Sequence, residues 1–227
     1  MINNTLKNYR MKNLSYQTTF VIVLLLITTY TAYAQTADAQ SVLEKTLQLY
    51  KQWSGMDIQF TTNIRSEKNG VSESFEGTMS MKADKFVLTT PDMMTWFDGT
   101  TQWTYWSRTG EVNISPPTGS DLQFLNPMIL LQGYQRDFNV SYIGESTSAN
   151  AKTAYDIALI PKKKDDIEKI EIQIEKNTSL PAKLVVTMRN DIRNTIHIKE
   201  VKEAEHPDQT FVFPENEYPD VEIIDLR

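Results

Sequence analysis

Residues 56–81 read MDIQFTTNIRSEKNGVSESFEGTMSM, and this stretch predicts two antiparallel strands joined by a tight turn. Apolar side chains at Met56, Ile58 and Phe60 alternate with polar ones. This alternation is typical of a strand with one face exposed to solvent. Asn69-Gly70 is a strong signal for a hairpin turn, and alternation resumes after it. We therefore expect the sheet to begin with a hairpin that has one apolar face.

The same combination of alternating runs and turn residues continues to the C-terminal end. Asp98-Gly99 predicts a second tight turn, and the charged run 162–166 predicts a hairpin connection. Ten or eleven strands are expected in total. Beyond the first hairpin, they centre on residues 86–88, 94–96, 103–105, 112–114, 138–142, 155–159, 170–174, 184–188 and 196–198, followed by the apolar tail 211–226.

Two segments have helical spacing instead. Apolar residues recur every three or four positions from about Ala37 to Trp53, which predicts one amphipathic helix. After Pro116 and Pro117, the dense apolar run 122–131 also has helical spacing. Pro127 interrupts it, so a pair of short helical turns or a kinked helix is expected there.

These elements predict a mainly β protein with helices. A sheet of this size with one apolar face must curl or pack against another layer, and two helices cannot cover it flat. We expect a strongly curved antiparallel sheet that forms an unclosed β-barrel. The N-terminal helix and a short mid-chain helical lid would fill its mouth.

The first 34 residues have the pattern of a secretory signal peptide. Lys7, Arg10 and Lys12 precede the apolar run 20–27, and the small-residue motif 32–34 follows it. The apolar run is far shorter than the roughly 20 residues of a membrane-spanning helix. Cleavage after Ala34 is expected, with Met1 or Met11 as the start; an N-terminal membrane anchor is the alternative interpretation.

The remaining residues, 35–227, are expected to form a single domain, since they contain no Pro/Ser-rich linker and no repeat. The first 34 residues hold three of the 23 basic residues and none of the 29 acidic ones, so the rest carries a formal net charge of −9. An acidic surface repels nucleic acid. The sequence has no cysteine, which excludes disulfides, thiolate metal sites and a lipid anchored on a cysteine after the signal.

Residues that could carry catalysis are sparse. His197 lies between two isoleucines, and we expect it to face solvent on the polar side of a strand; we expect the same of His206, in a charged loop. No nucleophile elbow, zinc motif or phosphate-binding glycine loop is present in the sequence. A secreted hydrolase remains an open alternative, because paired carboxylates are not excluded by one sequence.

Apolar and soft side chains are the more informative feature. Seven methionines lie beyond the signal, and methionine suits surfaces that accept varied apolar partners. The alternatives are an ordinary core or a core that doubles as a ligand cavity. The candidate cavity residues are Ile58, Phe60, Phe75, Met79, Met81, Phe86, Leu88, Met94, Trp96, Trp103 and Tyr105.

Four segments resemble the LolA-type lipoprotein carriers, in the order of that family. Residues 75–82 (FEGTMSMK) resemble its second strand, and residues 96–105 (WFDGTTQWTY) resemble its DG-x-x-x-W-x-Y hairpin. Residues 126–131 (NPMILL) resemble its Pro-containing helical segment. Residues 211–214 (FVFP), with 221–225 after them, resemble its C-terminal motif.

The resemblance implies an unclosed barrel with a helical lid and no cofactor. It implies a monomeric periplasmic chaperone that takes acylated lipoproteins from an inner-membrane ABC transporter and passes them to the outer membrane, to an acceptor where one exists. Our lid hypothesis names Leu122, Leu125, Met128 and Leu131, which would fill the cavity when it is empty and swing out when it is loaded. A periplasmic lipid or glycolipid sensor on the same scaffold is the alternative.

One position departs from the family pattern. The resemblance places a cavity-facing arginine just after the lysine that ends the second strand, where it holds the lid. Here Ala83 follows Lys82. Either the lid is held differently in this protein, or the correspondence is shifted by a residue or two.

Overall fold

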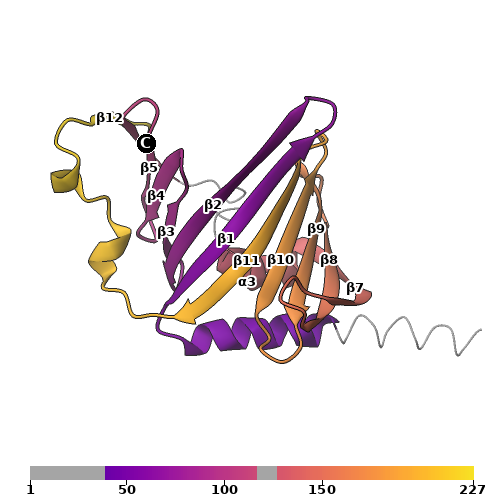
Figure 1. The fold of residues 1–227 in the computed structure, drawn as a ribbon. Helices are drawn as coiled ribbons and strands as arrows, with labels where there is room; N and C mark the ends of the chain where they lie inside the picture. The colour runs from indigo at the N-terminus through magenta and orange to yellow at the C-terminus, as the bar shows by residue number, and fades with distance from the viewer. Residues whose placement is uncertain (1–38, 117–126) are drawn as a thin grey trace, which may run out of the picture.

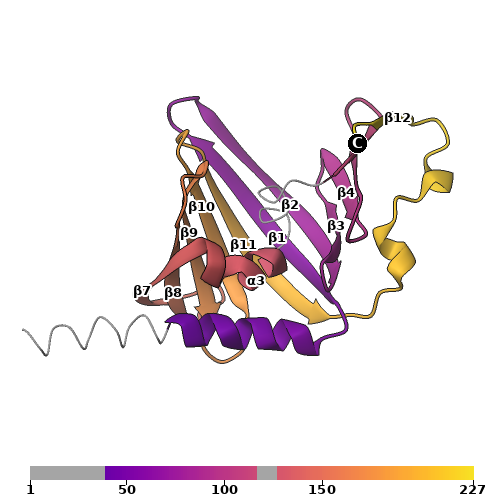
Figure 2. The same ribbon diagram turned by 180° about the vertical axis from the view of Figure 1, so that it is seen from behind.

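A computed structural model describes residues 39–116 and 127–227. They form one strongly curved sheet of twelve strands, in the order β12-β6-β5-β4-β3-β2-β1-β11-β10-β9-β8-β7 (Figures 1 and 2). Every neighbouring pair is antiparallel except β12 and β6. The edge strands β12 and β7 do not pair with each other, so the predicted unclosed barrel is confirmed.

The strands agree with the predicted positions. Their bounds are β1 Met56–Ser66, β2 Val71–Lys82, β3 Lys85–Thr89, β4 Met93–Phe97, β5 Gln102–Trp106, β6 Glu111–Ser115, β7 Phe138–Thr147, β8 Thr153–Pro161, β9 Ile167–Glu175, β10 Pro181–Met188, β11 Arg193–Glu203 and β12 Glu222–Asp225. The expected ten or eleven strands are thus twelve, because the tail supplies β12, which lies parallel to β6.

The first hairpin is the centre of the sheet. Ile58 of β1 lies opposite Met79 of β2 on one side and opposite Val201 of β11 on the other. A side chain at Gly77 would overlap the ring of Phe60, which lies in register with it. Glycine at this position therefore lets the Phe60 ring lie flat against the neighbouring strand.

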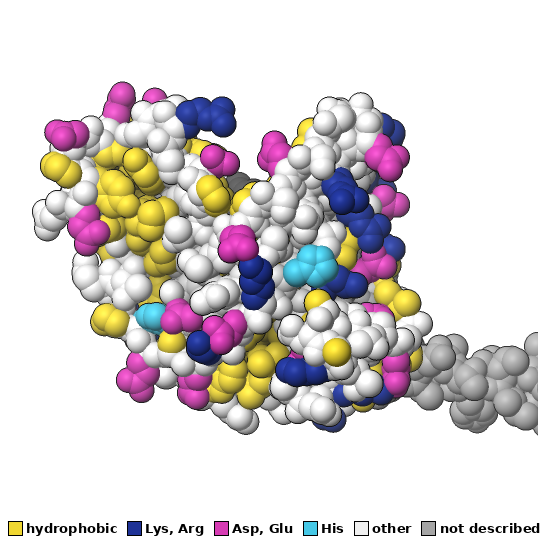
Figure 3. All heavy atoms as spheres, viewed as in Figure 1, with side chains coloured by type: hydrophobic (Ala, Val, Ile, Leu, Met, Phe, Trp, Pro, Cys, Tyr) yellow, Lys and Arg dark blue, Asp and Glu magenta, His cyan; other side chains and the backbone are white. Residues whose placement is uncertain are grey.

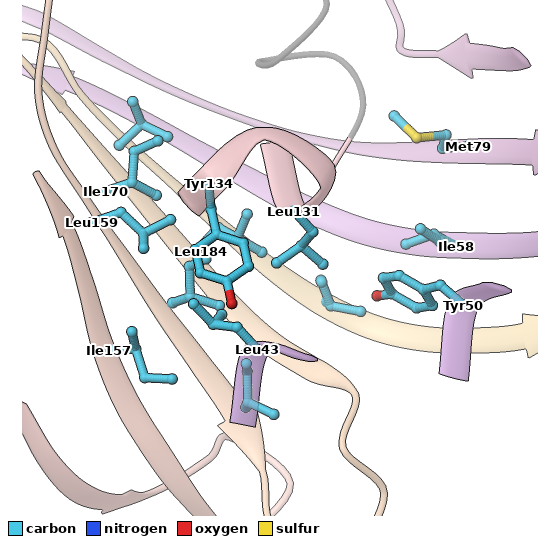
Figure 4. Packing of buried hydrophobic residues seen from close by; sticks show 14 of the residues in the cluster. Leu43, Tyr50, Ile58, Met79, Leu131, Tyr134, Ile157, Leu159, Ile170 and Leu184 are labelled. Atoms are coloured by element: carbon cyan, nitrogen blue, oxygen red, sulfur yellow. The ribbon is translucent and has the colours of Figure 1, made fainter. Parts of the chain in front are cut away.

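Two helices lie on the concave side of the sheet, as Figure 2 shows. The N-terminal helix covers 39–52 in the described part of the chain, and α3 covers Pro127–Asp137. Leu43 and Tyr50 lie on the buried stripe of the N-terminal helix, and Leu131 and Tyr134 on that of α3. Together with the concave face of the sheet they form the main hydrophobic cluster (Figure 4). Among the described residues, no helix is long and apolar enough to cross a membrane.

After β11 the chain turns back along the sheet through two short 3₁₀ helices, η1 Asp208–Phe211 and η2 Glu215–Glu217. His206 therefore does not face solvent, and the prediction for it was wrong: its side chain is 15% exposed and its Nε2 lies 3.0 Å from Asp57 Oδ1. Its ring also packs edge-on against Phe211. By contrast, His197 lies on the opposite face of β11 from Ile196 and Ile198, beside Thr195 in a shallow outer hollow.

A pair of lysines attaches this returning segment to the β2–β3 turn. Asp208 accepts hydrogen bonds from Lys82 at 2.7 Å and from Lys85 at 2.9 Å. These donors lower the pKa of the Asp208 carboxyl from its usual 3.8 to about 2. Three residues later, the Phe211 side chain is fully buried. At this end, the buried Phe211 ring and an exposed charge cluster therefore hold the segment.

We expect Phe211→Ala to destabilise the protein by about 3 kcal/mol, because it removes a fully buried ring. Urea denaturation monitored by tryptophan fluorescence measures the change. Gln209→Ala, at an exposed position of the same turn, is the matched control and should leave the midpoint unchanged. Equal midpoints for the two variants would show that the segment contributes nothing to the fold.

The Asp208 cluster predicts a pH dependence. The pKa of the Asp208 carboxyl is lower in the folded protein than in the unfolded chain. The ionised carboxyl therefore stabilises the fold above pH 3.8, and this stabilisation is lost as the pH falls through about 2. Asp208→Asn should therefore melt at a slightly lower temperature than the wild type at pH 7, and the difference should vanish near pH 2. Thermal unfolding across this range tests it, with Asp220→Asn as an exposed control; a difference that persists at pH 2 would contradict it.

Candidate functional site

A cavity of about 270 Å³ lies between the N-terminal helix and the concave face of the sheet. Strands β1, β2, β3, β9, β10 and β11 contribute most of its wall. The described residues that line it are Tyr50, Ile58, Phe60, Thr62, Ile64, Phe75, Met79, Leu88, Thr90, Met93, Ile167, Ile170, Leu184, Val186, Asn194, Ile196 and Ile198.

The lining is hydrocarbon almost throughout. None of these described residues carries a charge, and the only polar ones besides Tyr50 are Thr62, Thr90 and Asn194. Most of the apolar lining residues also belong to the main hydrophobic cluster. The cavity is therefore unfilled space within the core, and its walls suit an alkyl chain and disfavour a charged ligand.

Strand register builds this wall. Phe75, Thr62 and Ile196 lie in register on three neighbouring strands, and Leu184 continues the row on β10. In the next row, Ile64 lies opposite Asn194, which lies opposite Val186. Because side chains in register on adjacent strands point to the same face, these rows form a continuous floor that is apolar except at Thr62 and Asn194.

The structure divides the eleven candidate cavity residues into three groups. Ile58, Phe60, Phe75, Met79 and Leu88 line the cavity. Met81 and Phe86 are buried in the main cluster but are not among the lining residues. The remaining four, Met94, Trp96, Trp103 and Tyr105, belong to a second cluster.

This second cluster lies on the other face of β3 to β6. Trp96 packs edge-on against Phe213, with ring centroids 5.3 Å apart. The ring centroids of Tyr105 and Tyr218 are 5.0 Å apart. Tyr218 also donates a hydrogen bond to the sulfur of Met94 at 3.5 Å. The returning C-terminal segment thus covers these aromatic residues, and Figure 3 shows the hydrophobic side chains that remain visible on that face.

Sequence reasoning missed the part of the wall that comes from the second half of the chain. Strands β9, β10 and β11 supply Ile170, Leu184 and Ile196, and the N-terminal helix supplies Tyr50. The clean alternation of these strands with charged residues indicated one buried face. It did not indicate that this face continues the one on β1, which depends on the β1–β11 pairing.

The structure describes only some of the four residues named in the lid hypothesis. Leu122 and Leu125 lie outside the described residues. Met128 lies in α3, but its side chain is not described. Leu131 is 4% exposed and packs in the main cluster, although it is not one of the described lining residues.

Ala83 does not reach the cavity. It lies in the two-residue turn between β2 and β3, exposed and with a positive φ of 55°. A longer side chain at this position would start from the outer end of the hairpin. Lys82 and Lys85, on either side of the turn, hold Asp208 instead.

The described residues hold no group of three or more His, Asp or Glu side chains that could bind a metal ion. The most buried carboxylate, Glu175, accepts hydrogen bonds from Lys152, Ser148 and Thr178. Burial raises its pKa, but these partners outweigh that effect and lower it overall. Glu175 is thus a satisfied structural ion pair and does not line the cavity.

Two solved structures illustrate what this chain is similar to. A structure of an uncharacterized conserved protein from Thermus thermophilus superposes with a TM-score of 0.55 at 16% identity, covering 83% of this chain and 99% of that one. A LolA superfamily protein from Nitrosomonas europaea gives 0.45 at 11% identity, covering 77% and 97%. No curated protein matches the chain.

At the level of sequence, the model of the family described as "Outer membrane lipoprotein carrier protein LolA" matches residues 28–191. This is well over half of the chain, and it includes most of the strands that build the cavity. The chain therefore belongs to the LolA family of outer membrane lipoprotein carrier proteins.

Proposed function

We propose that this protein is an exported carrier that shelters the acyl chains of lipoproteins in the cavity beneath its N-terminal helix. The observation that carries the proposal is a cavity of about 270 Å³ in a LolA-family protein, whose described lining residues carry no charge. It would act without catalysis, since what this site offers is apolar surface. The route is the one implied by the family: from an inner-membrane ABC transporter, through the periplasm, to the outer membrane.

The size of the cavity supports reversible binding. Complete burial of an acyl chain of roughly 16 carbons would be worth about 12 kcal/mol, at ~0.8 kcal/mol per CH₂. Three such chains would exceed the affinity that non-covalent complexes reach. A volume of 270 Å³ is at the small end of ligand cavities, so the protein would enclose one chain or part of one. Partial enclosure lets the cargo leave again.

Filling the cavity should abolish binding. Ile196 is a partly buried lining residue of β11, and Thr195 beside it points to the opposite face. Ile196→Trp should lower the affinity for a fluorescent fatty acid at least tenfold, because the indole takes the space of the chain. Thr195→Trp is the matched control, which places the same indole on the convex face. If both folded variants bind like the wild type, the acyl chain does not occupy this cavity.

The cargo itself separates a lipoprotein carrier from a lipid sensor. Native mass spectrometry of the protein isolated from its own cells should show a complex with an intact acylated protein. Recovery of free lipid alone would favour the sensor. A delipidated lipoprotein should fail to bind in a pull-down in which the acylated form is captured.

A further inference from the structure

One of the described residues that line the cavity carries a buried polar atom without a hydrogen-bond partner. Tyr50 is 3% exposed, and its hydroxyl has no hydrogen-bond partner anywhere in the described structure. Figure 4 shows the ring extending from the N-terminal helix, with the oxygen directed into the hydrophobic cluster. An unpaired buried hydroxyl destabilises a protein, so its presence calls for a physical reason.

A second unpaired atom lies in the same wall. The Oδ1 atom of Asn194, on β11, is buried and has no hydrogen-bond partner among the described residues. By contrast, Tyr134 of α3 is as buried as Tyr50, and its hydroxyl accepts a hydrogen bond from Gln135 at 3.2 Å. Two of the described residues with an unpaired buried side-chain atom thus line the cavity.

We infer that the Tyr50 hydroxyl is a hydrogen-bond donor for the carbonyl oxygen that joins an acyl chain to the rest of its carrier molecule. This inference rests on the proposed function and specifies its ligand: an ester- or amide-linked acyl chain, in preference to a plain hydrocarbon. The bound carbonyl would accept a hydrogen bond from the unpaired Tyr50 hydroxyl, and such a bond is strong in apolar surroundings. Asn194 Oδ1 would accept from a donor on the ligand, such as an amide N–H or a hydroxyl.

The protonation state of the Tyr50 hydroxyl suits a hydrogen-bond donor. Burial raises the pKa of Tyr50 above its usual 10, so the group stays protonated and can donate throughout the physiological range. No described lining residue is charged, so no ion pair competes for the carbonyl. An acceptor such as an ester oxygen also enters an apolar cavity more readily than a carboxylate does.

Tyr50→Phe tests the inference because it removes the hydroxyl and keeps the ring. The measurement is displacement of N-phenyl-1-naphthylamine by three ligands of similar chain length: methyl decanoate, N-methyldecanamide and undecane. The wild type should prefer the ester and the amide to the alkane. In Tyr50→Phe this preference should fall about tenfold while undecane binding is kept, and the melting temperature should stay the same or rise.

Tyr134→Phe is the control, since it removes a paired hydroxyl that is not among the described lining groups. It should keep the wild-type preference for the ester and the amide. If Tyr50→Phe also keeps that preference, the inference is overturned while the carrier function stands. If none of the three ligands displaces the fluorophore from the wild type, the proposed function fails, and the inference fails with it.

Discussion

The pairing of β1 with both β2 and β11 is the constraint on which the rest of the structure depends. Through it, strands that are more than a hundred residues apart in sequence share one concave face. The sheet curves but its edge strands β12 and β7 remain apart, so this face is not closed by hydrogen bonds. Helices must cover it instead, and a helix packs on a curved sheet through side chains alone. The cavity is the space that this packing leaves.

In this fold the core and the candidate site are one surface. Ile58, Met79 and Leu184 belong to the main hydrophobic cluster and also line the cavity. Empty apolar space lowers stability, because the atoms around it lose packing contacts. Under the proposed function that loss is tolerable, since the cargo would restore the contacts when it binds. On the outer face, the C-terminal segment covers β3 to β6 through edge-on aromatic contacts of Trp96 with Phe213 and Tyr218.

Most of the fold could be predicted from the sequence. The candidate site could be predicted only in part. Alternation and turn residues located the strands, and helical spacing located the N-terminal helix. The aromatic residues of β4 and β5 were assigned to the cavity because they are large and apolar. They lie on the other face: β3 and β4 pack apolar residues on both faces, and period two does not say which face points inward. His206 was misjudged because nothing local shows that a charged loop will turn back onto Asp57.

The sequence by itself determined the period of each element, and with it the fold class: this information is local, because side-chain alternation and turn chemistry act over a few residues. The absence of cysteine and the presence of the family motifs can likewise be read directly from the sequence. Only the tertiary structure decided which apolar faces meet, which of them enclose space, and that the Tyr50 hydroxyl would have no hydrogen-bond partner among the described residues. Those outcomes depend on contacts between residues far apart in the chain, above all on β1 against β11, and no local pattern encodes such a pairing.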